Sequence, residues 1–309
     1  MPQGGYLPEG LLLHSAQNRG YTASPAAMER AIADGAILEG LAVLCDAAHN
    51  LTVSINGMRG VIPRVEAARG IESGKTRDIA IISRVGKPVC FKVIGVDENG
   101  VYRLSRRAAQ NEAMSYFLSN LFAGDVIRAR VTHLENFGAF VDIGCGNPSL
   151  IGIENISVSR ISHPHDRFAP RQDIYAVVTG ADVATGRIML SHRELLGTWE
   201  ENIAHVSPGE TVAGIVRGVE DYGIFVELAP NLSGLAERRE GMEPGMPVAV
   251  YIKSIIPERM KIKLIIIDAL PQLEGGLIRP EDYYITAGRL DRWVYTPPEC
   301  VTKVIETLF

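Results

Sequence analysis

Hydrophobic and polar residues alternate with a period of two in two stretches of this chain, and one stretch repeats the other. The first copy occupies residues 124–144 and the second residues 209–229, and the two align without a gap. In the first copy, aliphatic residues fill every second position before and after a turn: Ile127, Ala129 and Val131, then Ala139, Val141 and Ile143. This period is typical of half-buried strands, so each copy predicts two strands joined by a tight turn. A repeat of this regularity also predicts a chain built from similar modules.

The same alternation places an aromatic residue on the outer face of each repeat. Phe140 shares a face with Asp142, and a carboxylate is the side chain least expected in a core, so we expect Phe140 to point outward. In the second copy Phe225 and Glu227 have the same relationship. A bulge would shift the alternation by one residue and put Phe140 in the core, which is the alternative interpretation.

Each copy has a second aromatic residue at the turn, Phe137 in the first and Tyr222 in the second. Arg128 and Arg130 fall on the same predicted outer face as Phe140. Exposed aromatic rings stack on unpaired bases and contribute about 1–3 kcal/mol per base, and arginines contact phosphates. The pattern therefore predicts a surface for single-stranded nucleic acid on a small barrel.

Four short segments resemble the S-one repeat, an RNA-binding module with the OB fold. They are FGAFVD at residues 137–142, SLI at 149–151, RISHP at 160–164 and GRIMLS at 186–191. The resemblance covers about residues 123–193, and the second copy matches it less completely. The chain as a whole resembles multi-repeat relatives of ribosomal protein S-one.

The resemblance implies which residues contact RNA: two aromatics, a histidine on the third strand, and an Asp and an Arg near the fifth strand. In the better-matched repeat these are Phe137, Phe140, Asp182 and Arg187, with Gly152 where the histidine is usual and His163 in a neighbouring loop. In the last repeat they are Tyr222, Phe225 and Lys261, with Glu237 in place of the histidine. Asp182 and Arg187 have a structural alternative, an ion pair at the barrel rim.

The fold class we expect is mainly β, with three tandem five-stranded OB-fold barrels joined by short α-helices and the first barrel divergent. The expected divisions are an N-terminal arm and short helix (1–34), a divergent barrel (35–107), a linker helix (108–122), an RNA-binding barrel (123–193), a linker helix (194–207), a second RNA-binding barrel (208–269), and a tail docking on the last barrel (270–309).

The first barrel is expected from a series of short apolar runs between Gly- and Asx-rich turns. These runs are residues 37–45, 51–55, 78–83, 89–96 and 101–104. In the second run Val53 and Ile55 point inward, and no aromatic residue points outward. We therefore expect this barrel to have a structural or protein-contacting role.

The remaining segments are helical or irregular. Residues 1–24 are expected to form a loosely ordered arm, and Ser24 followed by Pro25 predicts the start of a short helix. Apolar residues at helical spacing predict linker helices over 106–122 and 193–205. Turn residues, among them Gly275 and Gly276, divide the tail, whose aromatic residues are expected to dock on the third barrel or to form a further base-stacking or partner surface. These are Tyr283, Tyr284, Trp293 and Tyr295.

Composition limits the function. The chain has 309 residues, 46% of them hydrophobic, and a net charge of −5, which argues against a strongly basic DNA-binding protein but not against RNA binding at a local surface. The four cysteines lack zinc-site spacing and indicate a reducing compartment, and we expect a cytoplasmic protein with no signal peptide or membrane segment.

No catalytic group, metal site, cofactor or small-molecule substrate is expected. Residues 70–76, GIESGKT, have one residue too few between the glycines for a phosphate loop and lack its strand–loop–helix context. His163 and His165 have no further ligands at a fixed spacing.

The leading hypothesis is a non-enzymatic protein that binds single-stranded RNA. Resemblance implies that its partners are mRNA and the small ribosomal subunit. A protein–protein adaptor built on the same barrels is the alternative, and an RNA-processing enzyme is a third interpretation, for which no site is apparent.

Overall fold

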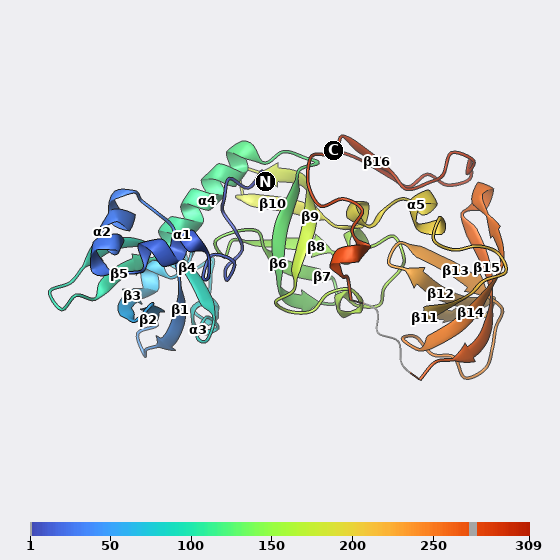
Figure 1. Cartoon of the computed structure of the whole chain (residues 1–309), viewed down its shortest axis with the longest axis horizontal. Helices are drawn as coiled ribbons and strands as arrows, with labels where there is room; N and C mark the ends of the chain where they lie inside the picture. Colours follow the sequence, from blue (N-terminus) through green and yellow to red (C-terminus); the bar gives the residue numbers. More distant parts are fainter. Residues whose placement is uncertain (1, 272–276) are drawn as a thin grey trace.

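The computed structural model describes residues 2–271 and 277–309, which fold into three closed five-stranded barrels arranged in a row (Figure 1). The predicted fold class, tandem five-stranded barrels with short helices between them, is confirmed. In each barrel the first strand pairs with the second and the fourth, and the third strand runs parallel to the fifth. The predicted turn glycines Gly275 and Gly276 lie outside the described residues.

The first barrel differs from its prediction at two elements. Its strands are β1 (Leu38–Cys45), β2 (Leu51–Ile55), β3 (Met58–Ile62), β4 (Pro88–Val96) and β5 (Tyr102–Ser105). The strand predicted over residues 78–83 is wrong, because this short apolar run forms helix α3 (Ile79–Ile82), which buries only Ile81. Short apolar runs do not distinguish a strand from a helix. Strand β3 was missed because Gly60 takes an inward position and Val61 an outward one, which hides its alternation.

The second barrel keeps the predicted inward and outward faces. Its strands are β6 (Val126–Glu135), β7 (Gly138–Asp142), β8 (Pro148–Gly152), β9 (Asp173–Asp182) and β10 (Arg187–Ser191). Ala139 and Val141 are fully buried, whereas Phe140 lies on the outer face and is partly exposed. A register shift is present, but it lies in β6 between Val131 and His133 and leaves the alternation of β7 intact.

The third barrel repeats this arrangement. Its strands are β11 (Thr211–Glu220), β12 (Gly223–Ala229), β13 (Leu232–Ala236), β14 (Pro247–Ile256) and β15 (Lys261–Ala269). Ile224 and Val226 are fully buried and Phe225 is 36% exposed, as the alternation predicts. Strand β11 has a register shift between Val216 and Gly218, at the position equivalent to the shift in β6.

Two different linkers connect the barrels. Helix α4 (Arg106–Asn120) begins at Ser105, whose hydroxyl accepts a hydrogen bond from the Ala108 amide, and Phe117 of this helix packs into the core of the second barrel. The second linker, expected to be one helix, consists of a 3-10 turn, Arg193–Leu196, and the short helix α5 (Trp199–Ile203). Gly197, with a φ of 79°, separates the two pieces.

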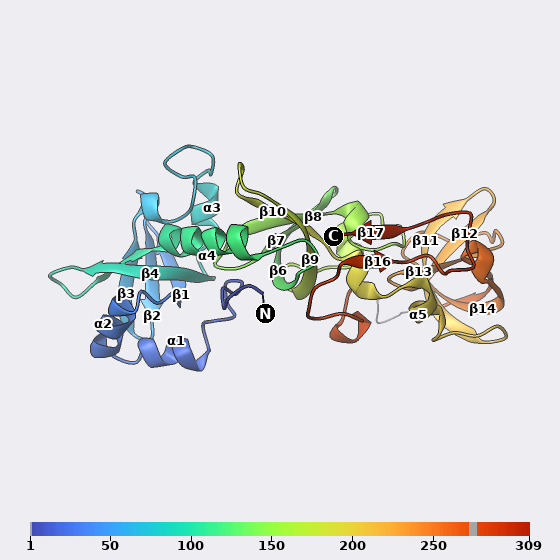
Figure 2. The same ribbon diagram turned by 90° about the horizontal axis from the view of Figure 1, so that it is seen from above.

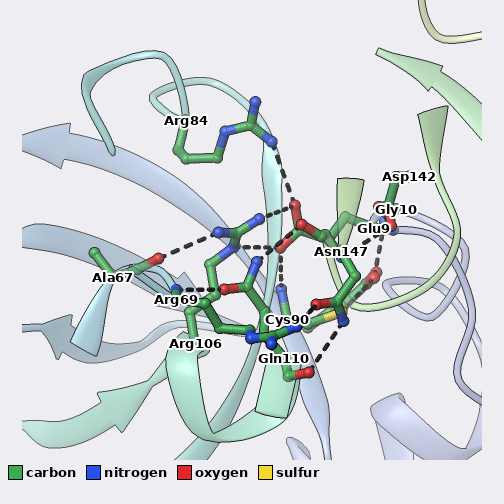
Figure 3. A network of polar contacts seen from close by, with 12 residues as sticks. Glu9, Gly10, Ala67, Arg69, Arg84, Cys90, Arg106, Gln110, Asp142 and Asn147 are labelled. Atoms are coloured by element: carbon green, nitrogen blue, oxygen red, sulfur yellow. Dashed lines mark hydrogen bonds and ion pairs between the residues drawn. The ribbon is translucent and has the colours of Figure 1, made fainter. Parts of the chain in front are cut away.

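The N-terminal arm is packed between the first two barrels, so the prediction of a loosely ordered arm is wrong. Within residues 1–24, Ala16–Tyr21 form helix α1, and helix α2 (Pro25–Ala33) follows, capped by Ser24 as predicted. Glu9 of the arm is buried and lies between Arg106 and Asp142 (Figure 3). Asp142 faces outward from its strand, as predicted, but is buried because the arm covers it.

Glu227, the equivalent carboxylate of the third barrel, is covered by the second barrel. It forms an ion pair with Arg167, which lies in the connection between β8 and β9, and a second ion pair of 3.0 Å with Arg217. Asp166 contacts Arg217 at 3.0 Å. Each junction therefore buries the carboxylate at the same outer position of the second strand of the barrel that follows.

The C-terminal tail packs on two barrels rather than on the last one alone. Trp293 of β16 (Arg292–Val294) and Tyr295 belong to the core cluster of the third barrel, whereas Ile278 and Tyr283 pack against the second barrel. Strand β16 pairs with β17 (Glu306–Leu308). Figure 1 shows the tail running along both barrels. Within residues 2–271 and 277–309, no helix has the length and apolar character needed to cross a membrane.

Candidate nucleic-acid interface

Phe137 and Phe140 form an exposed aromatic pair at the β6–β7 turn. Phe137 is 57% exposed, and the two ring centroids are 6.0 Å apart with an interplanar angle of 86°. Gly138 lies between them because β7 runs very close to β8: a Cβ at Gly138 would be 2.4 Å from the carbonyl oxygen of Ile151. The close packing of these strands therefore presents both rings to solvent from one edge of the barrel.

The strand register places Phe140 within a row of exposed side chains across the barrel. His133 of β6 and Leu150 of β8 are the cross-strand partners of Phe140, and Met189 of β10 pairs with Leu150. Leu150 is 38% exposed and Met189 is 50% exposed. The row offers apolar side chains beside two aromatic rings, which suits the flat faces of bases.

His133 lies on the same surface, although no pattern in the sequence singled it out. Its imidazole lies roughly parallel to Phe140, with centroids 6.3 Å apart at 27°, and its Nε2 is 2.7 Å from Glu135 Oε1. The register shift in β6 brings this side chain opposite Phe140. Although Gly152 replaces the usual histidine of the third strand, His133 provides an imidazole on the same surface from the first strand.

Arg187 and Asp182 lie at the end of the β9–β10 hairpin. They are cross-strand partners. Arg187 is exposed and points to the same outer face of β10 as Met189. Asp182 instead accepts hydrogen bonds from Thr185 Oγ1 at 2.6 Å and from the amides of Ala184 and Thr185, and the Thr185 hydroxyl is the main cause that lowers the Asp182 pKa. Among residues 2–271 and 277–309, no carboxylate pairs with Arg187 within 4.0 Å, so the proposed rim ion pair is not formed.

Three other predicted contact residues lie away from the aromatic pair. Arg128 is exposed, but it is five residues from His133 along β6, a separation of roughly 16 Å in an extended strand, and its amide donates to Gln3. Arg130 forms an ion pair of 2.6 Å with Asp173 and donates to the Glu9 carbonyl at 2.8 Å. His163 begins the 3-10 turn next to the third barrel, where its Nδ1 accepts from the His165 amide at 3.1 Å.

The third barrel carries an equivalent surface with more positive charge. Tyr222 is 70% exposed, and its ring lies 6.1 Å from that of Phe225 at 87°, nearly the geometry of the first pair. The equivalent row reads Gly218, Phe225, Leu235 and Lys263, so a lysine occupies the place of Met189 and a glycine that of His133. Lys261, opposite Ile256, takes the position of Arg187. Glu237 is exposed and follows directly after β13.

The first barrel has no aromatic residue in its equivalent row, in agreement with its sequence. Leu44, Thr52, Val61 and Arg103 take the places of His133, Phe140, Leu150 and Met189. Thr52 cannot stack on a base as a phenylalanine does, so this row lacks the feature that defines the other two.

Comparisons with known proteins agree with this geometry. Residues 120–193 match the family described as S1 RNA binding domain. Small ribosomal subunit protein bS1 of Staphylococcus aureus (strain N315) is 32% identical over 232 residues, covering 70% of this chain and 58% of that protein. The bS1 protein of Leuconostoc lactis is 29% identical over 244 residues, covering 72% of this chain and 55% of the relative. The chain thus spans little more than half the length of these curated relatives.

A solved multidomain protein with nucleic acid binding domains from Streptococcus pneumoniae is 16% identical over 78% of this chain and 76% of that chain, with a TM-score of 0.24. The fold is defined by the strand pairing described above.

The second barrel matches the S1 (S-one) domain family, and the third barrel repeats its strand pairing and its aromatic pair. The resemblance found in the sequence is confirmed: the second barrel is an S1 domain, and the chain is similar to the ribosomal proteins bS1 over most of its length.

Proposed function

We propose that this chain binds single-stranded RNA, including mRNA, through its second and third barrels and associates with the small ribosomal subunit. The observation that carries the proposal is the repeated aromatic pair, Phe137 with Phe140 and Tyr222 with Phe225, held at the same angle on both barrels. Similarity to the bS1 proteins supports the ribosomal partner and a cytoplasmic location. The binding role requires no catalytic step.

The second and third barrels contribute differently to RNA binding. The stacking surface of the second barrel is extended by His133, Leu150 and Met189, so this barrel binds mainly through base stacking. In the third barrel, exposed Lys263 continues the row of Phe225 and Leu235, and exposed Lys261 lies two residues away on the same strand, so this barrel gains more from phosphate contacts.

Titration of a fluorescently labelled oligouridine with the full chain tests the proposal. The double substitution of Phe137→Ala and Phe140→Ala should weaken binding by more than about 1 kcal/mol, because each ring stacks on a base. Phe122→Ala is the matched control, since Phe122 is 56% exposed but packs under Arg289 rather than in the row. Equal affinities for the double variant and the wild-type chain would refute the stacking role.

Co-sedimentation with small ribosomal subunits at two salt concentrations tests the partner. Retention that is lost on ribonuclease treatment of bound mRNA, but not at moderate salt, identifies an RNA-dependent association. Protein partners that persist in pull-downs after ribonuclease treatment would instead favour the adaptor hypothesis.

A further inference from the structure

The first barrel lacks stacking residues, yet one of its loops reaches the RNA-binding side of the second barrel. This loop follows the 3-10 turn Arg64–Glu66 and leads to α3. In Figure 2 the loop and the β9–β10 hairpin of the second barrel rise from the same side of the molecule. The contact between them is made by Arg69.

Arg69 is fixed by hydrogen bonds of both its backbone and its side chain. Its amide donates to Gln110 Oε1 of α4 at 2.9 Å, and its carbonyl accepts from Thr76 Oγ1 at 2.6 Å. The guanidinium crosses to the second barrel, where Nη1 donates to Asn147 Oδ1 at 3.3 Å. A Cβ at Gly186 would lie 3.2 Å from Nη2. Arg69 therefore lies beside the residue that precedes Arg187.

Arg69 lies next to the residue that precedes Arg187, and neither arginine has a counter-charge among the described residues. In the part of the chain that the structure describes, neither Arg69 nor Arg187 has a carboxylate within 4.0 Å, and Asn147 is a neutral acceptor. The nearest carboxylate of the hairpin, Asp182, already accepts three hydrogen bonds from its own turn. Partial burial of Arg69 raises the cost of this unbalanced charge, because desolvation disfavours the charged form.

An anion that bridges the two arginines would remove this imbalance. Guanidinium groups bind phosphate oxygens with two parallel hydrogen bonds, which makes them suited to a phosphodiester. Arg187 lies on β10, the strand that contributes Met189 to the exposed row. An RNA strand stacked on Phe140 would therefore pass Arg187 on its way toward the first barrel.

We propose that Arg69 and Arg187 form a composite site for an RNA backbone phosphate, built from two barrels. The site rests on the proposed function and adds a contact from the first barrel. It also gives a role in binding to a barrel whose outer row has no aromatic residue: the first barrel extends the positively charged path of the RNA beyond the stacking row.

The test compares the salt dependence of oligouridine binding for Arg69→Gln, Arg187→Gln and the wild-type chain. Each variant should bind several-fold more weakly, and its plot of log affinity against log salt should be shallower by about 0.7, the value for one phosphate contact on a single strand. Arg30→Gln, an exposed arginine of α2 at the far end of the first barrel, removes the same charge and should leave the slope unchanged.

Arg69→Lys separates the phosphate contact from a purely structural role. The lysine keeps the charge but not the forked hydrogen bonds, so the salt slope should stay at the wild-type value. Inorganic phosphate added at equal ionic strength should compete with RNA at the wild-type site and not in Arg69→Gln. A wild-type chain that binds RNA, with Arg69→Gln matching its affinity and slope, would overturn the composite site alone; a wild-type chain that does not bind RNA would overturn the proposed function.

Discussion

The amide of Glu9 donates a hydrogen bond of 2.7 Å to Oδ2 of Asp142, and this contact joins the N-terminal arm to the strand that bears Phe140. The Glu9 carboxylate pairs in turn with Arg106 at 2.6 Å and with Arg84 at 3.3 Å, both from the first barrel or its linker (Figure 3). Asp142 Oδ1 accepts from the amides of Gly144 and Gly146. The strand that presents the aromatic pair is thus also the anchor of the preceding module.

This junction predicts a pH dependence of stability. Burial, with the Glu9 charge as the next cause, raises the pKa of Asp142 from 3.8 to about 7. A carboxyl group whose pKa is raised on folding stabilises the folded state below its unfolded pKa, and this stabilisation is lost as pH rises through the folded value. We therefore expect the contribution of Asp142 to the free energy of unfolding to decrease between pH 5 and pH 8.

Urea unfolding of the wild-type chain and Asp142→Asn at both pH values measures this contribution. The wild-type chain should lose stability relative to Asp142→Asn as pH rises, whatever the absolute cost of the substitution. Glu9 does not interfere, because its pKa is lowered below 4.5 and its contribution changes only in more acidic solution. Parallel pH profiles for the two proteins would show that Asp142 does not titrate in this range.

The sequence predicts the barrels well because their cores depend on local alternation. Val53, Ala139 and Ile224 are buried as their parity requires. The failures have tertiary causes. Asp142 and Glu227 were expected in solvent, but neighbouring modules cover them, and no pattern within a strand reports what packs on its outer face.

The candidate site was predictable to a similar extent. Phe137 and Phe140 follow from the repeat, whereas His133 is placed beside them only by the pairing between two strands. An antiparallel pairing counted back from the turn places His133 opposite Phe140, and this count was the available signal. Arg130 pairs with Asp173 and with the Glu9 carbonyl, contacts that no local pattern reports because both partners are distant in sequence.

The difference between His133 and Gly218 predicts a transfer of stacking between barrels. A Cβ at Gly218 would meet only Phe225 Cδ2, at 3.8 Å, so the backbone has room for a Cβ on this face. Gly218→His should place an imidazole against Phe225 and strengthen oligouridine binding by up to about 1 kcal/mol, whereas His133→Gly should weaken it by about 1 kcal/mol or more. Fluorescence titration measures both. An unchanged affinity for His133→Gly would remove this residue from the binding surface.

Met189 and Lys263 occupy equivalent positions, and this difference predicts how much phosphate contacts contribute to RNA binding in each barrel. Lys263→Met should make the salt dependence of RNA binding shallower by about 0.7, and Met189→Lys should make it steeper by a similar amount, because each change removes or adds one phosphate contact. Lys87→Met, a change on the first barrel away from its equivalent row, is a matched control for charge. The prediction fails if Lys263→Met and Met189→Lys change the slope of log affinity against log salt in the same direction.

Tyr283 fastens the C-terminal tail to the second barrel through His192, and this contact predicts a specific loss of stability. Burial lowers the pKa of His192 to about 4, so its imidazole is neutral at pH 7. His192 Nδ1 lies 2.8 Å from the Ile156 carbonyl and must donate its single proton there, which leaves Nε2 to accept from the Tyr283 hydroxyl at 2.9 Å. Tyr283→Phe leaves this buried nitrogen without a partner, at a cost of about 1–3 kcal/mol.

The adjacent Tyr284 supplies the control, since its hydroxyl bonds the Glu201 carbonyl and His205 at an exposed site and the side chain is 40% exposed. Tyr284→Phe should therefore change stability by less than about 0.5 kcal/mol. Tryptophan fluorescence during urea unfolding follows both variants, because Trp199 and Trp293 lie in the core cluster that joins the tail to the third barrel. If Tyr283→Phe unfolds at the same urea concentration as Tyr284→Phe, the hydroxyl of Tyr283 does not hold the tail, and apolar packing of Ile278 and Trp293 alone accounts for its position.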